Sequence, residues 1–431
     1  MLIYNMNNHD LEINKIKNFI KLNKNCKFTL LRKSSCCFKS NYKNNTTGIN
    51  ISKLNNIIYI NTKENYVIAE PLVTMEQILI ECLKYNLTIP VLTEFKHMTI
   101  GGALVGQAGE SRSFIKGLMH ESVLEYEIIC GNGNIIKAKK DNEYSDIFYA
   151  IPGSYGSLGL VTYIKLSLEK ASKYIKLNYT IVETLADVKK YMIKELNNPT
   201  CDYLDCLGEN NKFKIIKGYK HYNISIKDWI YNFFNIYFFK FIWYYNHVVS
   251  INQNNYTEYL SYYDYTFRWD RCAFWHASKR LSYSMFNRLF LYNSLTCKNL
   301  YERAKRRTPE ERESKKINQD MMVPFDNLDI FFNTNVKYHN IFPMWILPIN
   351  NISNKYLYCL NKKKYYVNIG AYGYINNSSN NNFVNINRKL EKTVSENDGY
   401  KCMWSENYYN KDEFWKIYDK EKYDSLRNKY F

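Results

Sequence analysis

Apolar residues recur at helical spacing near the start of the chain and in strand-like segments after it. Within residues 11–22 they recur one to three positions apart, which predicts an amphipathic helix carrying Leu11, Ile13, Ile16, Phe19 and Ile20. From Phe28 to Ile60, short apolar segments are separated by turn-forming residues, a pattern typical of strands. The chain is therefore expected to open with one helix followed by short strands.

The next segment combines a strand with a capped helix. Residues 66–69 predict the strand. Thr74 to Gln77 have the form of a capping box, in which the Thr hydroxyl and the Gln side chain satisfy free backbone donors. We expect this helix to end at Asn86, because Asn tolerates a left-handed backbone.

Two glycines farther along predict a β-hairpin. Gly131 and Gly133 tolerate positive φ and separate the strand-like residues 123–130 from residues 134–139. A short helix is expected at 145–150 and a strand at 160–168. This succession of elements predicts an α+β fold. Beyond about residue 172 the chain becomes richer in aromatic residues and poorer in glycine, which indicates a second domain.

Length, composition and charge narrow the class of protein. The 431 residues suit two domains, since single cores usually stop growing at about 250–300 residues. The 41 Tyr residues and the recurring Asn runs indicate an AT-rich coding sequence. The net charge of +18 suits nucleic acid, an anionic membrane or a phosphate-bearing cofactor. Because the lysines are scattered and no nucleic-acid-binding motif is present, nucleic acid is not expected as a partner.

Cysteine usage and the N-terminus point to a location inside the cell. The 11 cysteines form no CxxC pair, which argues for reduced thiols in an intracellular, reducing compartment and against a metal site. The N-terminal residues lack the apolar core of a signal peptide, so secretion is not expected. The most membrane-like stretch, residues 229–249, is interrupted by polar residues. It predicts an amphipathic or core helix, or a segment lying in a membrane interface.

The sharpest chemical signal is a glycine-rich segment with the spacing GG-x3-G-x2-G, formed by Gly101, Gly102, Gly106 and Gly109. Glycines let backbone N–H groups approach phosphate oxygens without an intervening side chain. The segment is not a Walker loop, because no Lys-Ser or Lys-Thr follows, and it fits G-x-G-x-x-G poorly. Alone it is as often structural as phosphate-binding, so its context matters.

That context resembles a known type of flavoprotein. The order of strand, capped helix, glycine segment, hairpin and second glycine loop resembles the FAD-binding domain of the vanillyl-alcohol-oxidase, or PCMH, type. The amino-acid sequences of several segments resemble those of the delta(24)-sterol reductases. In the N-terminal half these segments are EPLVTMEQ, TIPVLTEF, TIGGALVG, YEIICGNG, DNEYSDIFYAIP and GSLGLV. In the C-terminal half the resemblance continues in INQDMMVPFDNL, FPMWILP, YVNIGAYG, LEKTVSENDGY and DEFWKIYDKEKYDSLRNKY.

The resemblance implies a two-subdomain PCMH-type FAD-binding domain with an α+β cap domain. The expected boundaries are 1–172 for the FAD domain, 173–394 for the cap and 395–431 for a segment returning to the FAD domain. The implied activity is reduction of the C24=C25 side-chain double bond of a sterol, with FAD as cofactor and NADPH as electron donor. Expected partners are a sterol or other apolar lipid and a membrane surface. Peripheral association with the endoplasmic reticulum, without the family's N-terminal anchor, is expected.

The family's FAD-binding stretch matches residues 99–111, with the pyrophosphate expected along Ile100 to Gly106. The backbones of Gly156, Gly159 and Val161 are expected to contact the adenosine or ring portion. His97, just before the segment, is a further candidate for cofactor contact. The stretch consists of Thr99, Ile100, Gly101, Gly102, Ala103, Leu104, Val105, Gly106, Gln107, Ala108, Gly109, Glu110 and Ser111.

The implied reaction also needs an acid near the flavin. An isolated alkene accepts hydride only if a proton reaches the adjacent carbon. Residues 259–275 resemble a family segment rich in Tyr, His and Arg. Tyr265 or a nearby acid is the expected proton donor, with Arg268 and Arg271 as charge partners. An amphipathic cap strand with core aromatics and surface arginines explains the same pattern.

Several positions depart from the family. Phe267 and Trp269 stand where it has His, Gly153 stands where it has Trp, and Lys33, Ser34 and Ser35 lie where it has Pro-Gly-Trp. Two other functions are therefore kept open. One is an FAD-dependent oxidase or dehydrogenase of another lipid or alcohol, which fast reaction of the reduced flavin with oxygen would indicate. The other is a noncatalytic FAD-binding or sterol-binding protein.

Overall fold

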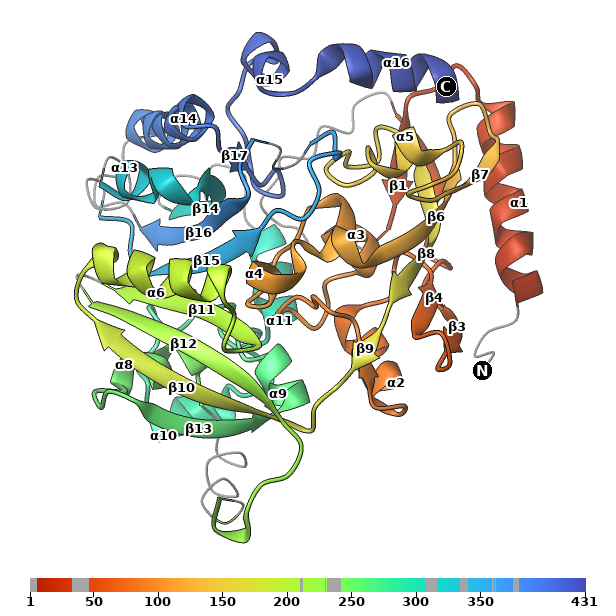
Figure 1. The fold of residues 1–431 in the computed structure, drawn as a ribbon. Helices are drawn as coiled ribbons and strands as arrows, with labels where there is room; N and C mark the ends of the chain where they lie inside the picture. Colours follow the sequence, from red (N-terminus) through yellow and green to blue (C-terminus); the bar gives the residue numbers. More distant parts are fainter. Residues whose placement is uncertain are drawn as a thin grey trace.

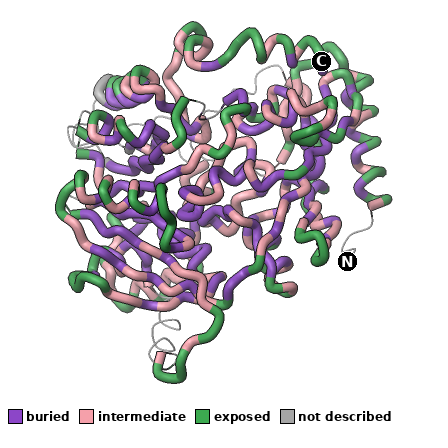
Figure 2. Tube along the Cα trace, viewed as in Figure 1, coloured by how far each residue is buried: buried purple, intermediate pink, exposed green. Residues whose placement is uncertain are grey.

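The computed structural model describes residues 6–32, 46–209, 212–228, 230, 242–306, 316–333, 340–358, 360, 362–374 and 380–431. Two antiparallel sheets organise these residues, one built early in the chain and one later, with helices packed around both (Figure 1). The strands of both sheets are largely buried, while the outer sides of the peripheral helices are exposed (Figure 2). The predicted α+β fold is confirmed.

The first sheet has five antiparallel strands in the order β3-β4-β8-β6-β7. Two small sheets, parallel β1-β2 and antiparallel β5-β9, lie outside it. The helices of this part are α1 (Met6–Leu22), α2 (Met75–Leu83), α3 (Ile100–Val105), α4 (Ser113–Lys116), η1 (Met119–Ser122) and α5 (Ser145–Phe148). Its strands are β1 (Phe28–Leu31), β2 (Thr47–Asn50), β3 (Ile57–Asn61), β4 (Tyr66–Ala69), β5 (Leu87–Thr88), β6 (Val123–Ile129), β7 (Ile135–Ala138), β8 (Leu160–Ser167) and β9 (Glu169–Lys170).

Local signals in this part are confirmed. Thr74 caps α2 through the full capping box with Gln77. Asn86 has a φ of 56°, the left-handed backbone expected after that helix. The hairpin β6-β7 turns at Gly133, whose φ is +80°. These signals are read correctly from sequence because each depends on residues close together in the chain.

The second sheet has eight strands in the order β13-β10-β12-β11-β15-β16-β14-β17, and every pairing is antiparallel. Its strands are β10 (Tyr174–Val182), β11 (Tyr203–Glu209), β12 (Lys212–His221), β13 (Tyr256–Ser261), β14 (Lys316–Pro324), β15 (Met344–Asn350), β16 (Tyr365–Tyr374) and β17 (Tyr400–Lys401). The helices around it are α6 (Leu185–Asn197), α8 (Tyr244–Ser250), α9 (Tyr262–Thr266), α10 (Met285–Phe290), α11 (Cys297–Lys305), η2 (Phe325–Asn327), α13 (Leu328–Phe331), α14 (Asn380–Glu396), α15 (Lys411–Ile417) and α16 (Lys420–Tyr430).

The two faces of this sheet differ. Side chains alternate along a strand, so neighbouring residues point to opposite faces. On β15, Met344 and Ile346 enter the core under α6, α13 and α14, whereas Trp345 and Leu347 enter the core shared with the first sheet. The pairing register aligns Leu207, Trp345, Gly370 and Asp320 in one row across four strands. One face is therefore covered by helices, and the other carries aromatic and acidic groups toward the first sheet's half of the molecule.

The C-terminal segment touches both sheets. β17 pairs with β14 at the edge of the second sheet. At the end of α16, the hydroxyl of Tyr430 donates to Asp146 at 2.7 Å, and Arg427 donates to the carbonyl of Ser157 at 2.7 Å. Both acceptors belong to the first sheet's half of the chain. The domain boundaries given above stay a prediction.

The membrane-like stretch 229–249 lies largely outside the described residues. Of its described part, Trp243, Tyr244, Tyr245 and Val248 are buried. Among the helices that the structure describes, none has the length and apolar character needed to cross a bilayer.

His9 fastens α1 to the first sheet. Its ring is fully buried, with Nδ1 2.7 Å from Oε1 of Glu70 and Nε2 3.0 Å from Oε1 of Glu127. Burial by itself lowers the pKa of His9, but the hydrogen bonds and charges of the two glutamates outweigh it and raise the pKa to about 9. At neutral pH the ring therefore carries both protons and donates to both carboxylates.

We expect the protein to lose stability between about pH 6.5 and 9 on account of His9. The folded pKa is raised from 6.5 to about 9, so the stabilisation is fully present below pH 6.5 and is lost as the pH rises through about 9. A shift of this size corresponds to about 3 kcal/mol of unfolding free energy. Urea unfolding measured across this pH range tests it. His9→Gln should remove that loss, whereas His221→Gln, whose ring contacts Tyr259 instead of carboxylates, should leave it; an unchanged pH dependence in His9→Gln would contradict the assignment.

Candidate functional site

Thr99 opens the predicted cofactor segment as the N-cap of α3, and its hydroxyl accepts from the N–H of Gly102 at 3.3 Å. Close packing explains why glycine occupies positions 101 and 106. A Cβ at Gly101 would lie 2.7 Å from Cβ of Pro71, and one at Gly106 would lie 2.9 Å from the carbonyl oxygen of Gly102. Only glycine therefore lets α3 pack this closely on the turn after β4.

The backbone N–H groups of residues 100–103 and 106–108 are engaged within the protein. For example, the N–H of Ile100 donates to the carbonyl of Val73, and that of Gly101 to the carbonyl of Pro71, both at 2.9 Å. A phosphate placed along this segment would compete with these bonds. The location of the pyrophosphate along Ile100 to Gly106 stays a prediction.

The second predicted cofactor loop lies against the first. The N–H of Gly153 donates to the carbonyl of Val105 at 2.9 Å. Nε2 of Gln107 donates to the carbonyl of Tyr358 at 2.8 Å. A Cβ at Gly153 would lie 2.5 Å from Cβ of Tyr358, so a larger residue at this position requires a different backbone around it. The glycine-rich segment and the second loop, which the sequence predicted separately as cofactor contacts, thus lie against each other.

The other predicted contacts of that loop differ in their surroundings. Gly156 has a φ of +83° and no neighbour within 4 Å of where a Cβ would stand, so its backbone faces open space. Gly159 has a φ of +129° and packs against Ile128 of β6. Val161, in β8, is buried and pairs with the same Ile128 across the sheet. The exposed face of Gly156 is the more accessible to a ligand.

The C-terminal end of the cofactor segment meets the predicted catalytic residues. Oγ of Ser111 lies 2.8 Å from the hydroxyl of Tyr265, and Oε1 of Glu110 lies 3.2 Å from NH2 of Arg268. The four residues come from two parts of the chain more than 150 positions apart. The structure therefore brings the predicted cofactor segment together with Tyr265 and Arg268.

Arg268 forms a buried ion-pair cluster. Its NH2 donates to Oδ2 of Asp205 at 3.0 Å, and Nε1 of Trp345 donates to the same oxygen at 2.8 Å. The guanidinium carbon lies 4.2 Å from the centre of the Tyr265 ring. Asp205 and Trp345 stand on the face of the second sheet that points toward the first sheet's half. The buried guanidinium stays charged because it pairs with two carboxylates, those of Glu110 and Asp205.

Arg271 is not part of this cluster. Its guanidinium lies 3.6 Å from the centre of the Tyr292 ring and donates to the carbonyl of the same residue. Phe267 and Trp269, two of the positions where the sequence analysis predicted a departure from the family, are buried. Trp269 packs edge-on against Tyr244 with ring centres 4.7 Å apart. The sequence placed the two arginines together, but only Arg268 lies beside Tyr265.

Glu94 is a candidate that the sequence analysis missed. It lies five positions before Thr99, is 8% exposed, and is within electrostatic reach of Glu110, Asp320 and Arg268. Burial, reinforced by the charge of Glu110, raises the pKa of Glu94 to about 8. The carboxyl therefore holds a proton at neutral pH. Its position in the mainly apolar segment TIPVLTEF, just before Phe95, is the sequence signal that could have identified it.

The balance of charge explains why an acid stays protonated here. Burial raises the pKa values of Glu110 and Asp320, against the opposing effect of Arg268 on the first and of three hydrogen bonds on the second. Burial opposes the charge of Arg268, but Glu110, Tyr265 and Asp205 outweigh it and raise its pKa. Glu110 and Asp205 thus share one cation, and ionising Glu94 as well would leave uncompensated negative charge.

Several buried polar atoms at this junction lack a hydrogen-bond partner among the described residues. Within the described part of the chain, Nε of Arg112, Oδ1 of Asp205 and Nε of Arg268 are buried without a hydrogen-bond partner. A small cavity of about 10 Å³ is lined by residues that include Arg112, Tyr265 and Arg268. A cavity of this size has room for about one water molecule, which would satisfy such groups. A flavin ring is far larger, so its placement beside Ser111, Glu110 and Arg112 requires these side chains to move apart and stays a prediction.

His97, the other candidate for cofactor contact, is set apart from the ion-pair cluster. Its ring is 5.8 Å from that of Tyr301, and neither ring nitrogen has a hydrogen-bond partner. Burial, together with nearby Lys305 and Lys298, lowers the pKa of His97 to about 4. It is therefore neutral.

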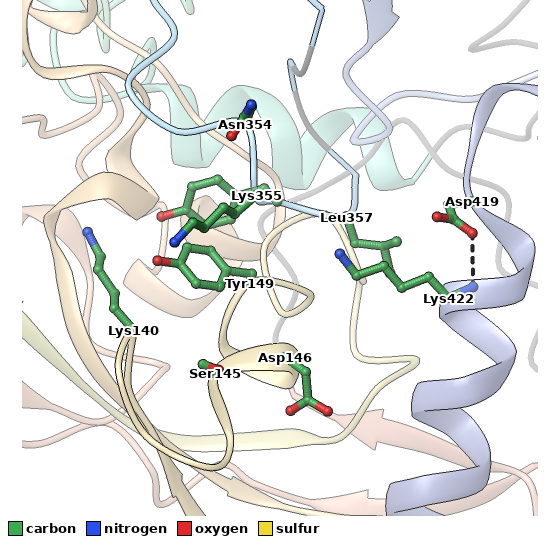
Figure 3. A pocket seen from close by; sticks show the side chains of 10 residues that line it. Lys140, Ser145, Asp146, Tyr149, Asn354, Lys355, Leu357, Asp419 and Lys422 are labelled. Carbon is green, nitrogen blue, oxygen red and sulfur yellow. Dashed lines mark hydrogen bonds between the residues drawn. The ribbon is translucent and has the colours of Figure 1, made fainter.

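A larger hollow lies elsewhere. Its volume is about 420 Å³, and it is formed between α5, residues 354–357 and the start of α16 (Figure 3). Lys140, Lys355 and Lys422 line it together with Tyr149. It contains none of the predicted site residues. The departures at Lys33, Ser34 and Ser35 lie outside the described residues. Among the described residues, no group of three His, Cys, Asp or Glu side chains is arranged so that it could hold a metal ion.

Comparison with known proteins identifies the cofactor class and several similar proteins. Residues 13–139 match the model of a family described as FAD binding domain. A delta(24)-sterol reductase homolog of Caenorhabditis elegans is 27% identical over 406 residues, 90% of this chain and 77% of that protein. The delta(24)-sterol reductase of Homo sapiens is 28% identical over 90% of this chain and 76% of its own length. That of Pisum sativum is 26% identical over 89% of this chain and 73% of its own.

A PCMH-type FAD-binding domain joined to an antiparallel sheet with a buried acid at the junction defines an FAD-dependent oxidoreductase. The predicted cofactor class, FAD, is thereby confirmed. The resemblance to the delta(24)-sterol reductase family, which the sequence segments predicted, is also confirmed and extends over nearly the whole chain.

Proposed function

We propose that this chain reduces the C24=C25 side-chain double bond of a sterol, with NADPH as the electron donor to FAD. Its resemblance to proteins named delta(24)-sterol reductases supports the substrate class. The observation that carries the proposal is the burial of Glu94 within electrostatic reach of Glu110 in the predicted cofactor segment, which raises the pKa of Glu94 to about 8. Oxidation of an alcohol would call for a base at that place, whereas reduction of an alkene calls for an acid.

When bound, FAD would supply hydride to one carbon of the double bond. The chain must deliver a proton to the other carbon. Glu94 suits this task because a pKa of about 8 keeps the proton bound at neutral pH while leaving it removable. Burial raises the pKa of Tyr265 well above 10, so the phenol is the weaker acid. We assign Tyr265 and Arg268 to holding Ser111 and Glu110 in position.

The aromatic face of the second sheet suits an apolar substrate. The ring of Phe274 lies 5.2 Å from that of Trp345 and 5.4 Å from that of Tyr372. Aromatic faces stabilise developing positive charge by about 0.5–2 kcal/mol each. A sterol is dissolved in membranes, which supports the predicted peripheral association with the endoplasmic reticulum.

An absorbance spectrum of the purified protein, followed by anaerobic addition of NADPH and then desmosterol, tests the function. Flavin bands at about 370 and 450 nm, bleached by NADPH and restored by desmosterol, are expected. Flavin that NADPH does not bleach would contradict NADPH as the donor. Reduced flavin that desmosterol leaves bleached but oxygen reoxidises rapidly would favour the oxidase alternative.

A further inference from the structure

α10 presents large apolar side chains to solvent. Phe286 is 66% and Phe290 72% exposed, Met285 is 61% and Leu289 47% exposed, and no residue of this helix is buried. The rings of Phe286 and Phe290 lie 4.4 Å apart, so the exposed surface is continuous. Single apolar residues on a surface are ordinary, but a cluster of four on one short helix indicates an interaction surface.

The chain around α10 is strongly basic. Residues 276–306 contain seven Lys or Arg residues and one acidic residue, Glu302. Arg288 lies in the helix itself, with its guanidinium 4.7 Å from the centre of the Tyr283 ring. The remaining basic residues are Lys279, Arg280, Lys298, Arg303, Lys305 and Arg306. A patch of large apolar side chains set in basic sequence is the composition that binds an anionic lipid surface.

We propose that α10 docks the protein on an anionic bilayer, with Phe286 and Phe290 entering the boundary between headgroups and acyl chains. The apolar side chains would gain burial, and the basic residues around them would contact anionic headgroups. In the view of Figure 1, α10 lies toward the lower end of the molecule and α16 at the upper end. A second copy of the chain is a poorer occupant of this surface, because the same basic segments would then face each other.

Flotation of the full chain with vesicles tests this inference without any measurement of activity, so it stands or fails separately from the proposed function. Vesicles of phosphatidylcholine alone are compared with vesicles containing phosphatidylserine. We expect binding to the anionic vesicles that weakens as salt is raised from about 0.1 M to about 0.5 M. The double variant Phe286→Asn/Phe290→Asn should lower the partition coefficient by about tenfold or more.

Two matched variants control for effects on folding. Phe286→Leu/Phe290→Leu keeps the apolar surface and should retain binding. Leu11→Asn/Leu22→Asn removes two exposed apolar residues from α1, which are 61% and 85% exposed, and should also retain it. Equal binding by the Asn variant of α10, or equal loss in the α1 variant, would overturn the proposal. So would a wild-type protein that stays off anionic vesicles but forms dimers that Phe286→Asn/Phe290→Asn abolishes.

Discussion

Glu94→Gln lowers the rate of substrate reduction by about 10²–10⁴-fold, the usual contribution of a general acid. Glutamine has nearly the same shape as glutamic acid but no proton to give. Bleaching of the flavin by NADPH needs no proton from Glu94 and should proceed at the normal rate. Stopped-flow absorbance separates the two half-reactions, and only reoxidation by desmosterol should slow.

The pH dependence gives a second readout of Glu94. With a pKa of about 8, the acid form is present below that pH, so the rate of reoxidation should fall as the pH rises through about 8. Glu94→Gln should lose this descending limb. Glu195→Gln removes another buried carboxyl, one paired with Lys217, and should keep it. A descending limb that persists in Glu94→Gln would assign the proton to another group.

Arg268→Gln destabilises the protein by about 3–5 kcal/mol, the usual cost of removing one partner from a buried ion pair. The loss leaves Asp205 and Glu110 buried without the cation that lies 3.0 and 3.2 Å from them. Urea unfolding at neutral pH measures the effect. The variant should recover stability as the pH falls, because protonation of the two carboxyls removes the uncompensated charge.

Arg271→Gln is the matched control for this experiment. Arg271 donates to a backbone carbonyl and lies over an aromatic ring. The buried Asp270 that feels its charge keeps Lys96 as a second cation, so the loss of Arg271 leaves less uncompensated charge than the loss of Arg268. We expect a smaller loss of stability and less recovery at low pH. If the two variants behaved alike, the distinction between the arginines would be wrong.

The different roles of these two arginines could not be predicted from the sequence. Both stand in one short motif, three positions apart, and nothing in the motif separates their roles. The backbone after α9 turns Arg268 toward Asp205 and Arg271 toward Tyr292. His9 was missed for a similar reason, since its two partners are 61 and 118 positions away in the chain.

The sequence by itself determined the class of fold, the capping box at Thr74, the hairpin at Gly133, the glycine segment and the FAD-binding family. These features depend on residues that are neighbours in the chain, or on segments long enough to be compared with relatives. Only the tertiary structure decided that Glu110 and Asp205 pair with Arg268 and that the buried Glu94 lies within electrostatic reach of this cluster, which raises the pKa of Glu94. A pKa depends on burial and on charges brought together by distant strands, and neither is encoded in local spacing.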